Sequence, residues 1–522
     1  MKKVLVIGLD GVSPELMFKD WINELPNLKK VYDNGATGSM SSVFPPVTAP
    51  AWTSFATGKN PGRHGIYDFI YPDGSLDRIK TVTSSDIRAK AYYEILNENG
   101  KKNILINMPV SHPPRTNDIM VTNFLAKSNK NVFPESLADE IPELREYRPI
   151  HDISLSQNKS DFGRFMDDIT DVEEKRFRSA KKLFQRQWDT FFVLFESTDF
   201  LHHIKYGEML GKKDKLILDF YRKIDSYVGW FMDNMDKDTV LIIMSDHGFK
   251  KIDGLILVNN ILRKKGMIKL ADKENGYYTS PFTEEYGEMT KDTPKVHVDF
   301  IYHKLAKMPA LLNLSRKFAK VLSKLNVKFE MKSRIDRAGS IAILPAFAGY
   351  IYINAKGRFD DGKVEQKDYG KTLNEIKKHL ESLKDDKQRP LFKRIYSRDE
   401  MYHGPFVKNA PDLLLVSENY HYDTFPLGES DINKIEMSTH SGTGIFMAYG
   451  NDIGKKSIGK LSIMDIAPTI LFIMNCEIPH DVDGRVLKEI FKPDSELYKA
   501  KIRLKKESEE DKIANALSSI KI

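Results

Sequence analysis

Short runs that are apolar at every position alternate along the chain with longer segments of helical periodicity. The apolar runs predict strands at Val4–Leu9, Asn103–Asn107, Phe191–Phe195, Val240–Met244, Tyr350–Ile353, Leu413–Val416 and Ile445–Ala448. The periodic segments predict helices at Arg88–Glu98, Phe162–Gln187, Lys215–Met235, Tyr369–Leu383 and Ser462–Met474. Wholly apolar strands are typical of a sheet that is buried on both faces. The alternation therefore predicts an α/β fold with a mostly parallel sheet, covered by helices and carrying its ligand site at the carboxyl ends of the strands.

One basic segment interrupts this alternation. Between Lys304 and Lys332 there are eight lysines or arginines and one acid, Glu330. We interpret residues 259–336 as an insertion or cap between two parts of one core, 1–258 and 337–490, with a charged helix or tail at 491–522. The basic segment could attract an anionic substrate, touch anionic lipid, or form a solvated helix over its own apolar stripe.

Composition narrows the class of protein. The 522 residues carry a net charge of +7 and one cysteine, Cys476, which excludes an intramolecular disulfide and a cysteine-based zinc finger. The apolar run near the N-terminus is too short for a secretion signal, so we expect a cytoplasmic protein. A charge this small, which the basic segment alone can account for, favours small anionic substrates over nucleic acid. Oligomeric state is left open.

Polar side chains follow several of the predicted strands, and one histidine, His440, stands shortly before the strand Ile445–Ala448. Each is ordinary when taken alone, since a turn aspartate or a structural histidine is common. Combined, they form a set of oxygen and imidazole ligands that suits Zn²⁺ or Mn²⁺. The set comprises Asp10, Asp199 with His203, Asp246 with His247, and His440. His202, next to His203, is better interpreted as a buried structural histidine.

The segment FPPVTAPAWTSFATGKNPGRHGIYD contains the candidate nucleophile, Thr48. Thr48 stands where a helix is predicted to begin, and the N-terminus of a helix favours a phosphate or a developing oxyanion. The alternative is an ordinary threonine N-cap. Lys59, Arg63 and His64 follow and could meet a substrate phosphate or pair locally.

Taken together, these motifs resemble one known group of proteins. LPNLKKVYDNGATGSM, PPVTAPAWTSFATGKNPGRHGIYDF, SDHG and SIMDIAPTILFIM are similar to the alkaline phosphatase superfamily. Within it the chain resembles the type I phosphodiesterase / nucleotide pyrophosphatase branch, and a prokaryotic group of phosphohydrolases or phosphomutases, from Lys3 to about Leu487. The resemblance implies a three-layer αβα sandwich with an inserted cap.

The resemblance also implies a mechanism. Thr48 matches the nucleophile that takes the phosphoryl group covalently. One divalent metal would be held by Asp10, Thr48, Asp246 and His247, and a second by Asp199, His203 and His440. The metals would activate the Thr48 hydroxyl and stabilise the leaving oxygen. The expected function is hydrolysis of phosphodiesters or phosphomonoesters with Zn²⁺ or Mn²⁺.

Three departures separate the branches of the superfamily. Thr48 is followed by Ala-Pro-Ala-Trp, which excludes the formylglycine motif of the sulfatases. The main insertion lies between His247 and His440, which leaves a phosphoglycerate-mutase-like phosphomutase as an alternative. Nucleotide pyrophosphatases carry a phosphate-contacting Asn where this chain reads Tyr67-Asp68-Phe69, so Asn107 is a candidate replacement. A metal- or phosphate-binding protein without activity is the remaining alternative, although no ligand of the set is missing.

Overall fold

The largest element of the fold is a mixed, mostly parallel sheet. A computed structural model describes residues 2–126, 131–152, 155, 161–270, 295–296, 328–329, 335–345, 349–417, 422–425 and 431–506. Within these residues the main sheet has the strand order β22-β2-β21-β9-β1-β8-β5-β6-β7. The strands are β22 (Lys456–Ser462), β2 (Ala36–Ser41), β21 (Thr443–Tyr449), β9 (Thr239–Met244), β1 (Lys3–Leu9), β8 (Thr190–Phe195), β5 (Asn103–Met108), β6 (Ile119–Thr122) and β7 (Val132–Phe133).

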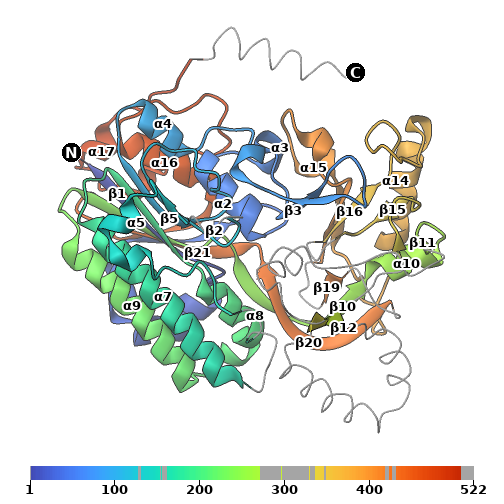
Figure 1. Cartoon of the computed structure of the whole chain (residues 1–522), viewed down its shortest axis with the longest axis horizontal. Helices are drawn as coiled ribbons and strands as arrows, with labels where there is room; N and C mark the ends of the chain where they lie inside the picture. Colours follow the sequence, from blue (N-terminus) through green and yellow to red (C-terminus); the bar gives the residue numbers. More distant parts are fainter. Residues whose placement is uncertain are drawn as a thin grey trace.

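Helices cover both faces of this sheet, because its central strands are mostly apolar on both faces and buried along nearly their whole length. Leu5 and Ile7 of β1 pack into one core with α1 (Pro26–Asn34), α7 (Phe162–Phe184), α8 (Ser197–Met209) and α9 (Lys215–Asn234). Val4 and Val6 point into a second core with α2 (Thr48–Thr57), α4 (Tyr92–Glu98) and α16 (Ile466–Ile473). The two helical layers lie on opposite sides of the sheet in Figure 1. The predicted three-layer α/β fold is confirmed.

Two of the predicted strands do not join the main sheet. Tyr350–Ile353 is β16 and Leu413–Val416 is β18, and both belong to a separate four-stranded sheet with the order β15-β16-β18-β17. The pairings in this sheet are antiparallel, with β15 at Ala342–Ile343 and β17 at Arg394–Ser397. A four-residue apolar run fits any buried sheet, so its pattern does not identify its partner. The Ile445–Ala448 run lies in β21, which pairs antiparallel with both neighbours.

The smaller sheet forms a lobe beside the main one, seen at the right of Figure 1. Its core includes residues of α10 (Val258–Lys264) and α14 (Gln366–Glu381). A long antiparallel ribbon of β10 (Gly248–Leu257) and β20 (Ile432–Ser441) links the lobe to the main sheet, with β19 (Tyr422–Phe425) along its edge. The ribbon was not predicted, because its residues alternate between apolar and charged in an irregular way.

The remaining described α-helices and β-strands are short. They are α3 (Pro61–His64), β3 (Ile70–Pro72), β4 (Ile79–Thr81), α5 (Leu137–Glu140), β11 (Lys269–Leu270), β12 (Lys295–Val296), β13 (Lys328–Phe329), β14 (Ile335–Asp336), α15 (Arg398–Met401) and α17 (Glu496–Lys499). Most of the basic segment Lys304–Lys332 and the last residues of the charged tail lie outside the described part of the chain. Among the described helices, none combines the length and the apolar character that a membrane crossing requires.

Candidate active site

The candidate site opens into a cavity of about 1000 Å³ at the carboxyl ends of the central strands. β9, β1 and β8 are parallel neighbours, so the residues that follow them meet at one edge of the sheet. Asp10 follows β1, Asp246 and His247 follow β9, and α8 begins just after β8 with Asp199 in its first turn. His440 reaches the same place from β20 of the ribbon. The structure thus brings all six predicted ligands together.

Asp10, Asp246 and His247 form the first group, which we call cluster A. His247 Nε2 lies 3.3 Å from Asp246 Oδ2, 3.6 Å from Asp10 Oδ1 and 3.9 Å from Asp199 Oδ1. All three side chains of cluster A are fully buried. Burial and the neighbouring carboxylates raise the pKa of Asp246 to about 7 and the pKa of Asp10 well above its usual value.

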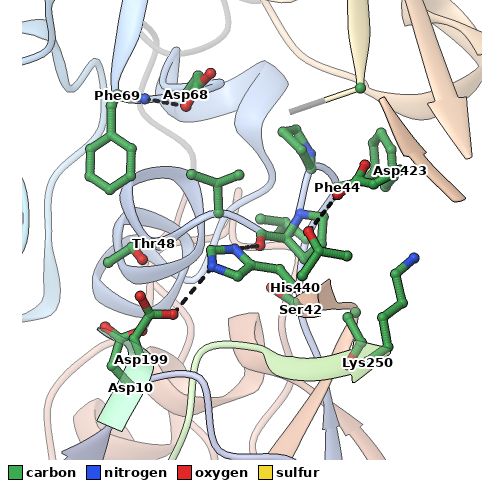
Figure 2. A pocket seen from close by; sticks show the side chains of 18 of the residues that line it. Asp10, Ser42, Phe44, Thr48, Asp68, Phe69, Asp199, Lys250, Asp423 and His440 are labelled. Atoms are coloured by element: carbon green, nitrogen blue, oxygen red, sulfur yellow. Dashed lines mark hydrogen bonds and ion pairs between the residues drawn. The ribbon is translucent and has the colours of Figure 1, made fainter. Parts of the chain in front are cut away.

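Asp199, His203 and His440 form the second group, cluster B. Asp199 and His203 lie one turn apart on α8, with His203 Nε2 at 3.4 Å from Asp199 Oδ2. His440 Nε2 lies 3.2 Å from Asp199 Oδ1 and 2.9 Å from His203 Nε2. Figure 2 shows Asp199, His440 and Thr48 converging on the cavity. Asp199 faces both clusters, since its Oδ1 also lies near His247.

Two of the three histidines in the clusters, His440 and His247, are held in the form that can ligate a metal. Nδ1–H of His440 donates to the carbonyl of Pro46 at 2.9 Å, and Nδ1–H of His247 donates to the carbonyl of Gly248 at 3.2 Å. These bonds leave Nε2 of each ring as a lone-pair donor toward the clusters.

Several buried polar atoms of the clusters have no hydrogen-bond partner. Leaving such an atom unsatisfied costs about 1–3 kcal/mol, more for a charged group. The unpartnered atoms are Asp10 Oδ1, Asp246 Oδ2, His247 Nε2 and, apart from its ion-pair contact with His440 Nε2, Asp199 Oδ1. All four belong to the two clusters and are the atom types that ligate divalent cations. Ligand atoms of Asp199, His203 and His440, and likewise of Asp10, Asp199 and His247, lie within 4.8 Å of one another, so the donor set fits the metals that the sequence predicts.

Thr48 lies at the same end of the cavity, buried and first in α2. The cap residue is Val47, in extended conformation, so Thr48 is not the N-cap that the alternative interpretation expected. The positive end of the dipole of α2 lies at its hydroxyl, which favours negative charge there. The indole of Trp52, one turn further along α2, donates to Asp10 Oδ2 at 3.1 Å and so ties the helix to cluster A.

Some residues at the site were not singled out from the sequence. Thr198 donates its hydroxyl to the carbonyl of Asp10 at 2.6 Å, and its place beside Asp199 was the only sequence signal. Asp68 lines the cavity, accepts a hydrogen bond from the Tyr350 hydroxyl at 2.6 Å, and has its pKa raised by burial to about 6. It stands where nucleotide pyrophosphatases are expected to carry an Asn.

Other predicted residues have structural partners. His202 bonds to the carbonyl of Gly11 and to the hydroxyl of Tyr221, as expected for a buried structural histidine. Asn107 donates to Leu194 and Glu196, and its oxygen accepts from Tyr147.

Lys59 and Arg63 form ion pairs with Asp481 and Asp483, so they are paired within the fold, although with residues distant in the sequence and not with local ones. The residues that line the cavity include none of Asn107, Lys59 and Arg63.

His64 makes unfolding depend on pH. It is fully buried, its Nδ1 accepts from the amide of Ile66, and Nε2–H donates to the Ser54 hydroxyl. Burial lowers its pKa from 6.5 to about 3. The unfolded chain thus binds more protons between these values, and stability falls as the pH drops below about 6.5. Removing this histidine (His64→Asn) should reduce the loss of unfolding free energy between pH 7 and pH 5 by about 2 kcal/mol.

Urea unfolding at both pH values, with chelator present, measures this effect. The exposed His480 offers a matched control. A change in pH dependence on replacing His480 by Asn as large as that in His64→Asn would contradict the assignment to His64.

Comparison with known proteins agrees with this geometry. Residues 4–350 match the model of the family "Type I phosphodiesterase / nucleotide pyrophosphatase". A search of curated proteins gives no match. Among solved structures, murine ectonucleotide pyrophosphatase / phosphodiesterase 5, in an inactive threonine-to-alanine form with AMP, has a TM-score of 0.54 at 14% identity. The match covers 94% of this chain and 100% of the murine chain.

The human ectonucleotide pyrophosphatase / phosphodiesterase 5 gives a TM-score of 0.52 at the same identity, with 94% of this chain and 100% of its own covered. At such identity the likeness shows the fold alone. The family hydrolyses phosphodiester or pyrophosphate bonds and generally binds divalent metals. By its family match, the chain belongs to the type I phosphodiesterase / nucleotide pyrophosphatase family of the alkaline phosphatase superfamily.

Proposed function

We propose that this chain is a two-metal phosphohydrolase that cleaves small anionic phosphodiesters or phosphomonoesters through a covalent phosphothreonine at Thr48. The observation that carries the proposal is the set of unpartnered buried ligand atoms in clusters A and B beside the buried Thr48. A protein without activity would be expected to have lost part of this set. The inactive threonine-to-alanine form of the murine relative agrees with a threonine nucleophile.

In the proposed reaction, cluster A with Thr48 and cluster B would each hold one divalent cation, Zn²⁺ or Mn²⁺. When bound, these cations would supply Lewis-acid chemistry to the Thr48 hydroxyl and to the leaving oxygen. Thr48 Oγ1 loses its proton to solvent and attacks phosphorus, and the ester bond to the leaving group breaks. Water then attacks the same phosphorus, the Oγ1–P bond breaks, and the threonine hydroxyl is restored.

The surrounding residues prepare this chemistry. Trp52 and Thr198 fix the side chain and the backbone of Asp10, respectively. The dipole of α2 stabilises charge that develops on Thr48. Pro46 and Gly248 set the tautomers of His440 and His247.

A paired set of chromogenic esters tests the proposal. Protein stripped of metal and reloaded with Zn²⁺ or Mn²⁺ should release p-nitrophenol from bis(p-nitrophenyl) phosphate, from p-nitrophenyl phosphate, or from both. The stripped protein should release none. The ratio of the two kcat/KM values identifies the diester or the monoester as the preferred class. Release no faster than from metal salts alone would contradict the proposal.

A further inference from the structure

The cavity continues beyond the two clusters, where polar side chains stand among apolar ones. In Figure 2, Lys250 and Asp423 lie on one side of Thr48 and His440, whereas Phe69 lies on the other. Much of the remaining lining is apolar, for example Phe44, Leu255 and Val416. A substituent on the substrate's phosphoryl group that enters the Lys250 side of the cavity therefore meets this ammonium group.

Lys250 is placed by the same strand pair that places His440. β10 begins directly after His247, and in its pairing with β20 Phe249 lies opposite His440 and Lys250 lies opposite Thr439. The rings of Phe249 and His440 are 5.0 Å apart. The position of the lysine relative to cluster B is therefore fixed by backbone pairing and not by a mobile loop.

The polar groups around Lys250 are arranged as a small site. Lys250 is partly buried, and its Nζ donates to the carbonyl of Ser417 at 3.4 Å. Asp423 accepts hydrogen bonds from the amide of Thr424 at 2.7 Å and from the hydroxyl of Thr439. Burial lowers the pKa of Lys250, and the charge of Asp423 acts against that shift.

Thr424 adds an unpartnered hydroxyl. Its side chain is 2% exposed, it lines the cavity, and its Oγ1 has no hydrogen-bond partner. A buried hydroxyl without a partner costs about 1–3 kcal/mol, which a bound acceptor would recover. The cavity thus offers this hydroxyl donor in addition to the ammonium of Lys250.

Lys250 also stands apart from the other basic residues nearby. Among the described residues that line the cavity, the lysines and arginines are Lys250 and Lys460, and Lys460 is exposed. Lys251, the next residue of β10, is exposed and passes over Gly207 of α8, outside the cavity lining. Lys250 is therefore the cation that an anion deep in the cavity would meet, and an anion in a largely apolar cavity needs such a partner.

We propose that Lys250 binds a second anionic group, a carboxylate or a phosphate, carried by the substituent of the phosphate ester that the enzyme cleaves. This inference rests on the proposed function, because it assumes that the phosphoryl group lies at Thr48. It names the substrate class as phosphate esters with an additional acidic group, and it makes Lys250 a specificity-determining residue.

Calorimetric binding of matched phosphonates to the zinc-loaded protein tests the inference without turnover. The ligands with a neutral tail are propyl- and hexylphosphonate. The ligands with a carboxylate tail are phosphonopropionate and phosphonohexanoate. The corresponding alkylene diphosphonates represent a tail that ends in a phosphate. An acidic tail of the fitting length should improve Kd about tenfold. Lys250→Met should abolish that gain, Lys250→Arg should keep most of it, and Lys251→Met should leave it unchanged.

The outcomes separate this inference from the proposed function. Equal Kd values for acidic and neutral tails would overturn the role of Lys250, and so would an improvement in Kd by the acidic tail that persists in Lys250→Met. In either case, binding of the neutral-tailed phosphonates would still support the phosphoryl site. Tighter binding of aminopropylphosphonate than of phosphonopropionate assigns the site to Asp423 and also overturns it. Binding of no phosphonate at all counts against both proposals. The carboxylate and diphosphonate series show which acidic group the site prefers.

Discussion

Replacing Thr48 with alanine is expected to lower kcat for aryl phosphate esters by about a thousandfold or more. The hydroxyl is the proposed acceptor of the phosphoryl group, and its loss leaves the two clusters without a nucleophile. No described hydrogen bond of the fold depends on that hydroxyl, so the unfolding free energy should change by less than about 1 kcal/mol. Steady-state release of p-nitrophenol measures the first effect, and urea unfolding measures the second.

Two variants control this prediction. Thr48→Ser keeps a hydroxyl and should stay within about tenfold of the wild-type kcat. Thr53, in the same helix, donates its buried hydroxyl to the carbonyl of Ala49 at 2.7 Å. Its replacement by Ala should cost stability but little activity. If Thr48→Ala hydrolyses the esters as fast as Thr53→Ala does, Thr48 is not the nucleophile.

The sequence could predict the central part of the site because of a simple property of parallel sheets. Asp10, Asp199 and Asp246 each come after a wholly apolar run, and the three runs proved to be the neighbouring parallel strands β1, β8 and β9. Asp199 lies in the first turn of the helix that follows β8. The residues at the carboxyl ends of these strands therefore lie close together at one edge of the sheet, and this does not depend on the fold of the other segments. The same apolar pattern predicted the two helical layers.

The position of His440 could not be predicted in this way. It depends on the register of β20 against β10, in which His440 lies opposite Phe249, and the two strands are far apart in the sequence. Register between distant strands follows from the packing of the whole lobe and not from local pattern. Its residue type, in combination with the other ligands, and the family resemblance identified this ligand, and periodicity did not.

Ion pairing explains why Lys59 and Arg63 were harder to assign. Basic residues after a nucleophile helix suit a phosphate, but Asp481 and Asp483 from the C-terminal part of the chain neutralise them. The cation that does line the cavity, Lys250, lies in a ribbon whose mixed pattern gave no strand signal. A partner distant in the sequence cannot be seen from local composition.

Replacing His440 with alanine is expected to remove about one metal per chain and to lower kcat/KM about a hundredfold or more. His440 Nε2 lies within 3.2 Å of Asp199 and 2.9 Å of His203, so cluster B loses one of its three ligands. Metal that binds only the folded state stabilises it by about 2.7 kcal/mol at a hundred times Kd. Adding EDTA should therefore lower the Tm of the wild type more than that of His440→Ala. Elemental analysis and thermal unfolding measure the two effects.

A histidine remote from the site provides the control, because it shows whether replacing any histidine by alanine would have the same effect. His379 lies on α14 in the smaller lobe, outside both clusters, and His379→Ala should keep the full metal content and the EDTA effect. Metal content that is unchanged in His440→Ala would show that cluster B holds no metal through this residue. Metal bound at either cluster would satisfy the buried unpartnered carboxylates of Asp10 and Asp246, and its removal should therefore destabilise the folded protein. A wild-type Tm that does not respond to EDTA would contradict metal binding by either cluster.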